Sequence, residues 1–386
     1  MNNNISGVLE EDCCGCGACF QICPKKSITM EENKRGFFLP HVNKDVCVQC
    51  GLCVKVCPER NSILGHPVKE AYAAVSNDTG TLRKSTSGGV FGELSRLILN
   101  RNGVVFGCGW KDNIVQHVCI EQIEDIGIIQ QSKYLQSDTA TSFIDAKTYL
   151  NSGKLVLYSG TACQLAGLVK FLGKEYDNLI TVEVACHGVP SPGLFRKYCD
   201  WLIKNNNSRI NKFQFRSKNF HKKGEHYRFS VEFANGKKKS YLSWEDPYYG
   251  SFLQGRTLRD TCYHCKYKNN ERISDLLLAD FWGIEKEHPD FPAQYGASAV
   301  MVMTEKGKKI LESVSEHLLI QNSSFERIVM HNKSIIDTVQ VPQNQKLIDI
   351  NIPEEQLFRE LKPAFSIKRR IRNMIPEQLK YIIKRL

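Results

Sequence analysis

The order of apolar and polar positions predicts alternating strands and helices in the middle of the chain. Residues 70–76 alternate between the two kinds of side chain, as a half-buried strand does, and apolar residues between 90 and 98 recur at helical spacing. Shorter apolar runs predict strands at 103–109, 154–158 and 179–185, and amphipathic segments predict helices at 142–151, 161–172 and 191–205. This alternation is typical of an α/β layer with a largely parallel or mixed sheet.

The pattern changes at about residue 209. Strands are predicted at 209–216, 227–234, 237–243, 273–282 and 297–304, and a helix at 306–319. Asn235-Gly236 between two of these strands is a strong hairpin signal. Beyond Pro353 we expect a separate helical tail.

Two runs of four cysteines near the start of the chain share one spacing. They read Cys13-x2-Cys16-x2-Cys19-x3-Cys23-Pro24 and Cys47-x2-Cys50-x2-Cys53-x3-Cys57-Pro58. In two-cluster bacterial ferredoxins, which have this pattern, the fourth cysteine of each run ligates the other cluster. We therefore expect one 4Fe-4S cluster on Cys13, Cys16, Cys19 and Cys57, and a second on Cys47, Cys50, Cys53 and Cys23. Zinc knuckles are the competing interpretation, but zinc sites favour two x2 pairs over a three-plus-one run.

The composition is that of a soluble globular protein that uses thiolates as ligands. The chain has 386 residues, of which 42% are hydrophobic, 24% are charged and 16 are cysteines. Its first residues show no signal peptide and no apolar run is long enough to span a bilayer, so we expect a reducing cytoplasm. The formal charge of +11 is weak support for nucleic-acid binding, because thiolate-ligated clusters are anionic and no basic stripe carries interleaved aromatic residues.

Four later cysteines lie at the ends of predicted elements. Cys163 and Cys186 follow the carboxyl ends of strands, where open α/β sheets place their sites, and Cys262-x2-Cys265 forms a pair. From spacing alone, a third cluster, a zinc site and structural thiols stay equally open. The remaining cysteines have no partner set, and we take all of them as structural thiols: Cys14, Cys108, Cys119 and Cys199.

The segment Ser85-Thr86-Ser87-Gly88-Gly89 is a candidate phosphate-binding loop. It precedes a predicted helix and offers hydroxyls, free amides and the positive end of a helix dipole. A plain helix N-cap explains the same residues, and the segment is not a GxGxxG fingerprint.

Six motifs in one order resemble the coenzyme F420 hydrogenase/dehydrogenase beta subunit family. They are Ser87-Gly88-Gly89-Val90-Phe91, Ser132-Lys133-Tyr134-Leu135-Gln136-Ser137, Ser159-Gly160-Thr161-Ala162-Cys163-Gln164, Cys186-His187-Gly188-Val189-Pro190-Ser191, Arg259-Asp260-Thr261-Cys262-Tyr263-His264-Cys265-Lys266 and Ala279-Asp280-Phe281-Trp282-Gly283. The resemblance covers roughly residues 70–320 and follows the ferredoxin module. Ala162 and Ala279 depart from the usual proline and glycine, which puts the loop geometry near the cofactor in doubt.

The resemblance implies a third 4Fe-4S cluster on Cys163, Cys186, Cys262 and Cys265, and an FAD. The expected cofactor contacts are Ser87, Gly88, Gly89, Thr161 and Gln164. The expected catalytic residues are Lys133 and Tyr134 beside the flavin, with Lys133 stabilising the reduced anionic ring, and His187 near the cluster or substrate. A solvent lysine, a packing tyrosine and a strand-capping histidine are the alternatives, and Asp280 and Trp282 line a pocket or belong to the core.

Three regions follow from these patterns. Residues 1–66 form a two-cluster ferredoxin module, and residues 67–345 form the FAD/4Fe-4S catalytic domain, in two parts at 67–150 and 151–345. Residues 353–386 form a basic amphipathic helical tail, which either contacts an anionic membrane surface, such as the inner membrane face, or docks its apolar side on the domain.

The predicted fold is thus α/β (α+β), with a small ferredoxin-like domain, a larger mixed-sheet domain and a helical tail. The predicted function is an iron–sulfur flavoprotein oxidoreductase that passes electrons between a ferredoxin or redox partner subunit and a two-electron organic substrate, with a deazaflavin such as coenzyme F420 as the family's example. The alternative is a non-catalytic electron-transfer subunit of a larger redox complex.

Overall fold

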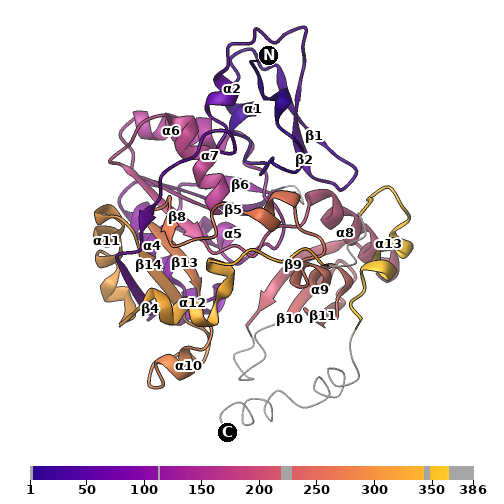
Figure 1. Cartoon of the computed structure of the whole chain (residues 1–386). Helices are drawn as coiled ribbons and strands as arrows, with labels where there is room; N and C mark the ends of the chain where they lie inside the picture. The colour runs from indigo at the N-terminus through magenta and orange to yellow at the C-terminus, as the bar shows by residue number, and fades with distance from the viewer. Residues whose placement is uncertain (1–2, 112–113, 219–227, 343–347, 365–386) are drawn as a thin grey trace.

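An eight-stranded mixed sheet organises the larger part of the protein (Figure 1). The computed structural model describes residues 3–111, 114–218, 228–342 and 348–364. The strand order is β15-β4-β14-β13-β8-β7-β5-β6, in which β13, β8, β7 and β5 run parallel. The strands are β4 (Glu70–Ser76), β5 (Val104–Lys111), β6 (Ile114–Ile120), β7 (Val156–Gly160), β8 (Leu179–Val184), β13 (Leu276–Asp280), β14 (Ser298–Val302) and β15 (Leu318–Ser323).

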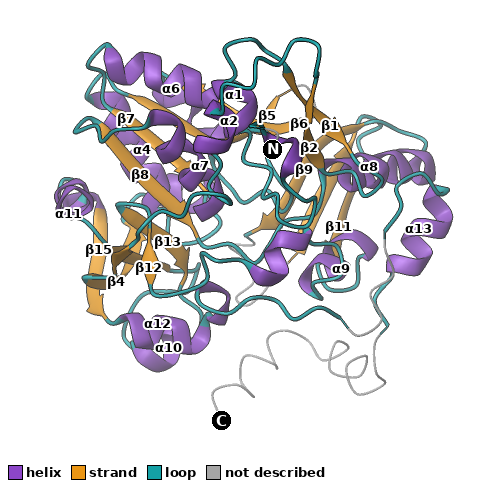
Figure 2. Ribbon diagram, turned by 45° about the horizontal axis from the view of Figure 1, so that its top comes forward, coloured by secondary structure: helices purple, strands orange, loops and turns teal. Residues whose placement is uncertain are grey.

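Helices cover both faces of this sheet. Val105 and Leu157 point into one core with α4 (Val90–Asn100) and α11 (Glu305–Glu312), whereas Phe106 and Tyr158 point into the opposite core. That second core is closed by α6 (Ser142–Asn151) and α7 (Ala162–Leu172), which lie beside β7 and β8 (Figure 2). The shorter helices are α3 (Thr79–Lys84), η2 (Ile123–Asp125), α5 (Ile126–Ile129), α10 (Ile284–Glu287), η4 (Ser315–His317), α12 (Phe325–His331) and η5 (Lys333–Ile335). Burial on both faces explains why the central strands are continuous apolar runs.

The ferredoxin module projects from one side of the sheet domain, at the top of Figure 1. It consists of η1 (Ile5–Gly7), α1 (Ala18–Ile22), α2 (Leu52–Lys55) and the antiparallel pair β1 (Ile28–Glu32) and β2 (Phe38–Val42). A two-residue ladder between β3 (His66–Pro67) and β12 (Glu271–Arg272) follows it. Helix α1 contacts α6 and α7, so the module is packed directly on the larger domain.

A second, antiparallel sheet carries an aromatic core. It joins β9 (Ile210–Ser217), β10 (Arg228–Phe233) and β11 (Lys238–Leu242) and is covered by α8 (Pro192–Asn206), α9 (Pro247–Leu253) and α13 (Glu354–Leu361). The apolar side chains of α13 are buried there, so the first part of the predicted tail packs on the domain. The basic segment 365–386, including its predicted membrane contact, lies outside the described residues. No helix in the described ranges is long and apolar enough to cross a membrane.

The predicted elements agree with the structure except at a few places. The helix predicted at 306–319 was too long, because α11 ends at Glu312 and Leu318 begins β15, which pairs with the outer side of β4. The strand predicted at 273–282 starts later, since Asp275 accepts hydrogen bonds from Thr181 instead of joining the ladder. Strand β6 had not been predicted, because polar Gln116 and His117 interrupt its apolar pattern.

Candidate functional site

The structure brings together the four cysteines predicted to hold the first cluster. Burial, and after it the neighbouring thiols of Cys13 and Cys57, raise the pKa of Cys19. Burial likewise raises the pKa of Cys57, with Cys13 among its neighbours, and Cys16 lies beside Cys13 and Cys19. A cysteine must lose its proton to ligate iron, so cluster binding here opposes a raised pKa.

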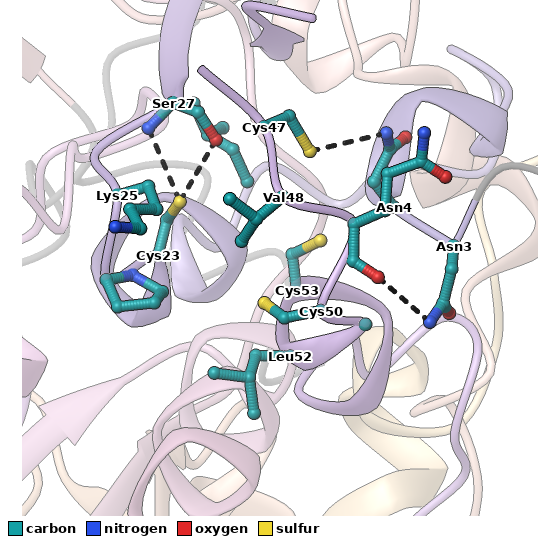
Figure 3. A pocket seen from close by; sticks show the side chains of 14 residues that line it. Asn3, Asn4, Cys23, Lys25, Ser27, Cys47, Val48, Cys50, Leu52 and Cys53 are labelled. Atoms are coloured by element: carbon teal, nitrogen blue, oxygen red, sulfur yellow. Dashed lines mark hydrogen bonds between the residues drawn. The ribbon is translucent and has the colours of Figure 1, made fainter.

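The four cysteines predicted for the second cluster line one small pocket. Cys23, Cys47, Cys50 and Cys53 point toward each other across it (Figure 3). Asn4 Nδ2 donates to Cys47 Sγ over 3.6 Å, and Ser27 N donates to Cys23 Sγ over 3.4 Å. Although burial opposes it, hydrogen bonding from Ser27 lowers the pKa of Cys23. Donors of this kind tune a thiolate that ligates a metal.

The late quartet, Cys163, Cys186, Cys262 and Cys265, lines a large cavity of about 830 Å³. Cys163 is in the first turn of α7, directly after β7, and Cys186 follows β8. The other two cysteines come from η3 (Asp260–His264) and its C-cap. Burial, and after it Cys163, raises the pKa of Cys265 to about 12. Cys262 has the other three cysteines as electrostatic neighbours, so the quartet is assembled from three distant segments.

These thiols surround a volume rather than a single point. In the described ranges, no three His, Cys, Asp or Glu side chains are grouped so that they could hold one metal ion. A zinc site requires thiolate sulfurs at about 2.3 Å from one ion, whereas the four cysteines of a cubane cluster bind separate irons. The described residues therefore fit clusters better than they fit zinc.

Cys14 was predicted to be a structural thiol, and the structure places it in the site instead. It is buried, lines the large cavity, and interacts first with the thiol of Cys16 and then with that of Cys163. Hydrogen bonding with Cys14 is also the main cause that raises the pKa of Cys163. The first ligand run is therefore in side-chain contact with the late quartet through Cys14.

Backbone carbonyls of the first ligand run are held by the larger domain. Gln136 Nε2 donates to the Cys14 carbonyl over 2.9 Å, and Thr139 Oγ1 donates to the Cys16 carbonyl over 2.8 Å. Arg259 donates to the Cys13 carbonyl and to Gln136 Oε1. A Cβ atom on Gly167 would lie 2.9 Å from Cys16 Sγ, so α7 needs a glycine where the run approaches it.

The predicted phosphate loop lies at the cavity but has structural uses for its polar groups. Ser87 and Gly89 line the cavity, whereas Gly88 donates its N–H to Ser298 Oγ, and a Cβ there would collide with the Ala74 carbonyl. Ser87 Oγ donates to the Ala297 carbonyl over 2.6 Å. Close packing against β4 and β14 thus accounts for Gly88 without a ligand.

Lys218 lies at the same loop and was not predicted. Its ammonium donates to the carbonyls of Leu82 and Ser87, and burial lowers the pKa of Lys218 to about 7. No local motif marks this lysine, because it reaches the loop only through the second sheet.

Lys133 and Tyr134 line the cavity, as predicted, with their polar groups already engaged. Lys133 Nζ donates to the carbonyls of Cys108, Ile128 and Gln130 at 2.8, 3.2 and 2.7 Å, which uses all three of its protons. Burial lowers the pKa of Lys133 to about 8. The Tyr134 ring packs on Tyr249 and Phe252. A catalytic role for these two residues stays a prediction.

Thr161, Gln164 and His187 also line the cavity. Thr161 and Gln164 form the capping box of α7, so their side chains define where that helix begins. His187 Nε2 is buried and has no hydrogen-bond partner in the described part of the chain. Burial lowers the pKa of His187 to about 4, so the ring is neutral near pH 7. Since buried polar atoms are normally satisfied, His187 favours a ligand in this cavity.

Arg216, which the sequence did not indicate, joins the predicted Asp280 and Trp282 on the cavity wall. Arg216 Nη1 lies 2.6 Å from Asp280 Oδ2, and its guanidinium lies 5.4 Å from the centroid of the Trp282 ring. Asp280 ends β13 at the same sheet edge as the ends of β7 and β8. Parallel strands therefore bring Cys163, Cys186 and Asp280 to one edge.

His117 on β6 is expected to make the fold sensitive to acid. Its Nε2 donates to the Ser159 carbonyl over 3.0 Å and its Nδ1 accepts from the Ser137 hydroxyl, while burial lowers the pKa of His117 to about 4. The unfolded chain binds a proton near pH 6.5 and the folded chain does not, so stability falls by roughly 3 kcal/mol as pH drops through this window. Urea unfolding of His117→Gln across the window should show a shallower fall, and exposed His66→Gln should match wild type. Parallel slopes for wild type and His117→Gln would contradict this assignment.

Comparisons with known proteins agree with the two-part site. Residues 153–327 match the family described as the C terminus of the coenzyme F420 hydrogenase/dehydrogenase beta subunit, and residues 12–61 match the 4Fe-4S dicluster domain. Among solved structures, the F420-reducing [NiFe] hydrogenase complex from Methanosarcina barkeri contains a similar chain, with 18% identity and a TM-score of 0.45. The match covers 71% of this chain and 91% of that one. No curated protein matches the chain.

Proposed function

Because the chain belongs to the coenzyme F420 hydrogenase/dehydrogenase beta subunit family and carries a 4Fe-4S dicluster domain, we propose that it is an iron–sulfur flavoprotein oxidoreductase. In this proposal it passes electrons between a ferredoxin-type carrier and a two-electron organic substrate. A deazaflavin is the substrate class that the family's name suggests.

One observation carries the proposal. The late quartet and the predicted flavin contacts line the same cavity, and Cys14 joins that cavity to the first ligand run. Its volume of about 830 Å³ lies within the range of about 300–1,000 Å³ that is usual for cofactor and ligand sites. The three cysteine groups therefore form a continuous series that ends at a space suited to an organic ring.

The walls of the cavity fit FAD chemically. Lys218 and the N-terminus of α4 place positive charge and amides at the Ser87 loop, which suits a pyrophosphate. Arg216 is oriented by Asp280 and could pair with an anionic part of a ligand. When bound, 4Fe-4S clusters supply one-electron transfer and a flavin supplies the exchange with two-electron chemistry.

The residues of this chain would position these groups and keep water away from them. Tyr134 is fixed by Tyr249 and Phe252, so it offers a rigid aromatic wall. Neutral His187 offers its buried Nε2 as a hydrogen-bonding atom to whatever fills the adjacent space. Lys133 holds three carbonyls together at the cavity wall and positions the segment before Tyr134.

The proposal also includes a location and a division of labour. All sixteen cysteines are free thiols, which suits a reducing compartment such as the cytoplasm. Residues 1–66 would exchange electrons with the carrier, and residues 67–345 would hold the cofactor and substrate.

The test is anaerobic purification with iron, sulfide and flavin counted per chain. The proposal predicts about twelve irons, four for each cluster, and about one FAD. Replacement of Lys218 by methionine should weaken flavin binding about tenfold with iron unchanged, because a charged hydrogen bond contributes about 1.5–3 kcal/mol. Lys212→Met, which removes an exposed lysine from β9, is the matched control.

The same measurement separates the proposal from its alternative. A chain with its full iron content but no flavin, which exchanges electrons with a carrier and reduces no small molecule, would be an electron-transfer subunit. Bound zinc without visible absorbance would reject both functions.

A further inference from the structure

The two cluster sites of the ferredoxin module differ in their access to solvent. Cys16, Cys19 and Cys57 of the first site are buried, and Cys14 beside them reaches the large cavity. At the second site Cys50 is exposed, and Cys23 and Cys47 are partly exposed. Electrons can therefore reach the surface most directly at the second site.

Apolar side chains are exposed around this second site. Val46, Val48 and Leu52 are 44%, 59% and 38% exposed, and each is a chain neighbour of one of the site's cysteines. Figure 3 shows Val48 and Leu52 beside the thiols of the pocket. Isolated exposed apolar residues are common on protein surfaces, but three around an exposed redox site favour a contact with another protein.

The charges on the same segments have mostly one sign. Residues 23–28 and 43–55, which carry all four cysteines of the site, contain four exposed lysines and one exposed acid: Lys25, Lys26, Lys44, Lys55 and Asp45. Acidic residues 10–12 instead precede Cys13 on the other run. A basic rim around an apolar centre complements an acidic partner that also has an apolar contact surface.

We propose that the face formed by residues 23–28 and 43–55 is the docking site of an acidic one-electron carrier protein of the iron–sulfur type. This inference rests on the proposed function and adds where the carrier binds and which charge it has. In each encounter the reduced carrier loses one electron and this chain gains one, while no bond forms or breaks and no proton has to move. Because the lysines steer the encounter, its rate falls as salt rises.

The test uses the holoprotein and a reduced acidic two-cluster ferredoxin as the probe. Stopped-flow bleaching of the cluster absorbance gives the second-order rate constant at several ionic strengths. Lys25→Gln, Lys26→Gln, Lys44→Gln and Lys55→Gln in one chain should lower the rate constant at low salt at least about tenfold and flatten its salt dependence. Val48→Asn should lower the rate at every salt concentration, because the apolar contact is not screened.

A matched variant controls for total charge. Lys212→Gln, Lys237→Gln, Lys238→Gln and Lys239→Gln remove the same four charges from exposed positions on and beside the second sheet, and should leave the rate near wild type. Reduction by dithionite, which needs no docking surface, should be equal in all three proteins and shows that the clusters are intact.

Three results would overturn the docking site. They are an unchanged rate in the first variant, an equal loss in the control variant, and a carrier complex that persists in high salt, as a permanent subunit would. Flavin content does not enter this measurement, so a preparation with clusters but without flavin rejects the oxidoreductase and leaves the docking test valid. A preparation that dithionite cannot bleach lacks clusters and rejects both.

Discussion

Replacement of Cys262 by serine is expected to lower the iron bound per chain from about twelve atoms to about eight, because one cluster of three loses a ligand. Cys262 is buried, and its sulfur has Cys163, Cys186 and Cys265 as electrostatic neighbours. None of the ferredoxin cysteines is among its neighbours, so the two ferredoxin clusters should remain. Iron and sulfide analysis after anaerobic purification measures the change, and electron paramagnetic resonance identifies the clusters that are left.

The matched control for this prediction is Cys199→Ser. Cys199 lies on α8 and packs against the aromatic core of the second sheet, away from all three groups of cysteines. Its variant should keep the wild-type iron content. If Cys262→Ser bound as much iron as wild type, the late quartet would not hold a cluster.

Replacement of Arg259 by methionine is expected to cause the largest loss of stability, roughly 3 kcal/mol or more, because it breaks a buried network of charge-assisted hydrogen bonds. The side chain is nearly inaccessible to solvent and donates to three acceptors. These are the Cys13 carbonyl at 2.5 Å, Gln136 Oε1 at 2.8 Å and the Phe38 carbonyl at 2.9 Å. Arg259 is also three residues before Cys262, so it ties the first ligand run and β2 to the late quartet.

Guanidinium-induced unfolding of the anaerobic protein measures this loss. Arg256→Met is the control, because Arg256 is only partly buried and donates to the carbonyls of Glu360 and Leu361 on α13. It should cost about 1 kcal/mol, as a partly exposed hydrogen bond does. Arg259→Met should also slow the transfer of electrons from the ferredoxin module to the cavity, whereas Arg256→Met should not. Equal stability of the two variants would show that the Arg259 network does not join the module to the domain.

Local patterns were enough to predict the ferredoxin module. Each ligand run places three cysteines in one short loop, so spacing alone defines which sulfurs can share a cluster. The same holds for most elements of the large sheet, since a buried strand needs an apolar run and a covering helix needs apolar residues at helical spacing. The prediction failed where an edge contact decided the outcome, as at Leu318, where pairing with β4 overrode the helical pattern.

The order of the residues along the chain thus determined the cluster ligands of the module, the α/β class and the ends of strands where chemistry was expected. Only the tertiary structure decided that Cys14 lies against Cys163, that Lys218 reaches the Ser87 loop and that Arg216 pairs with Asp280. Each of these contacts joins segments that are far apart in sequence. Sequence periodicity records which face of an element is buried, but which distant side chain meets that face depends on how the sheets and the module pack together.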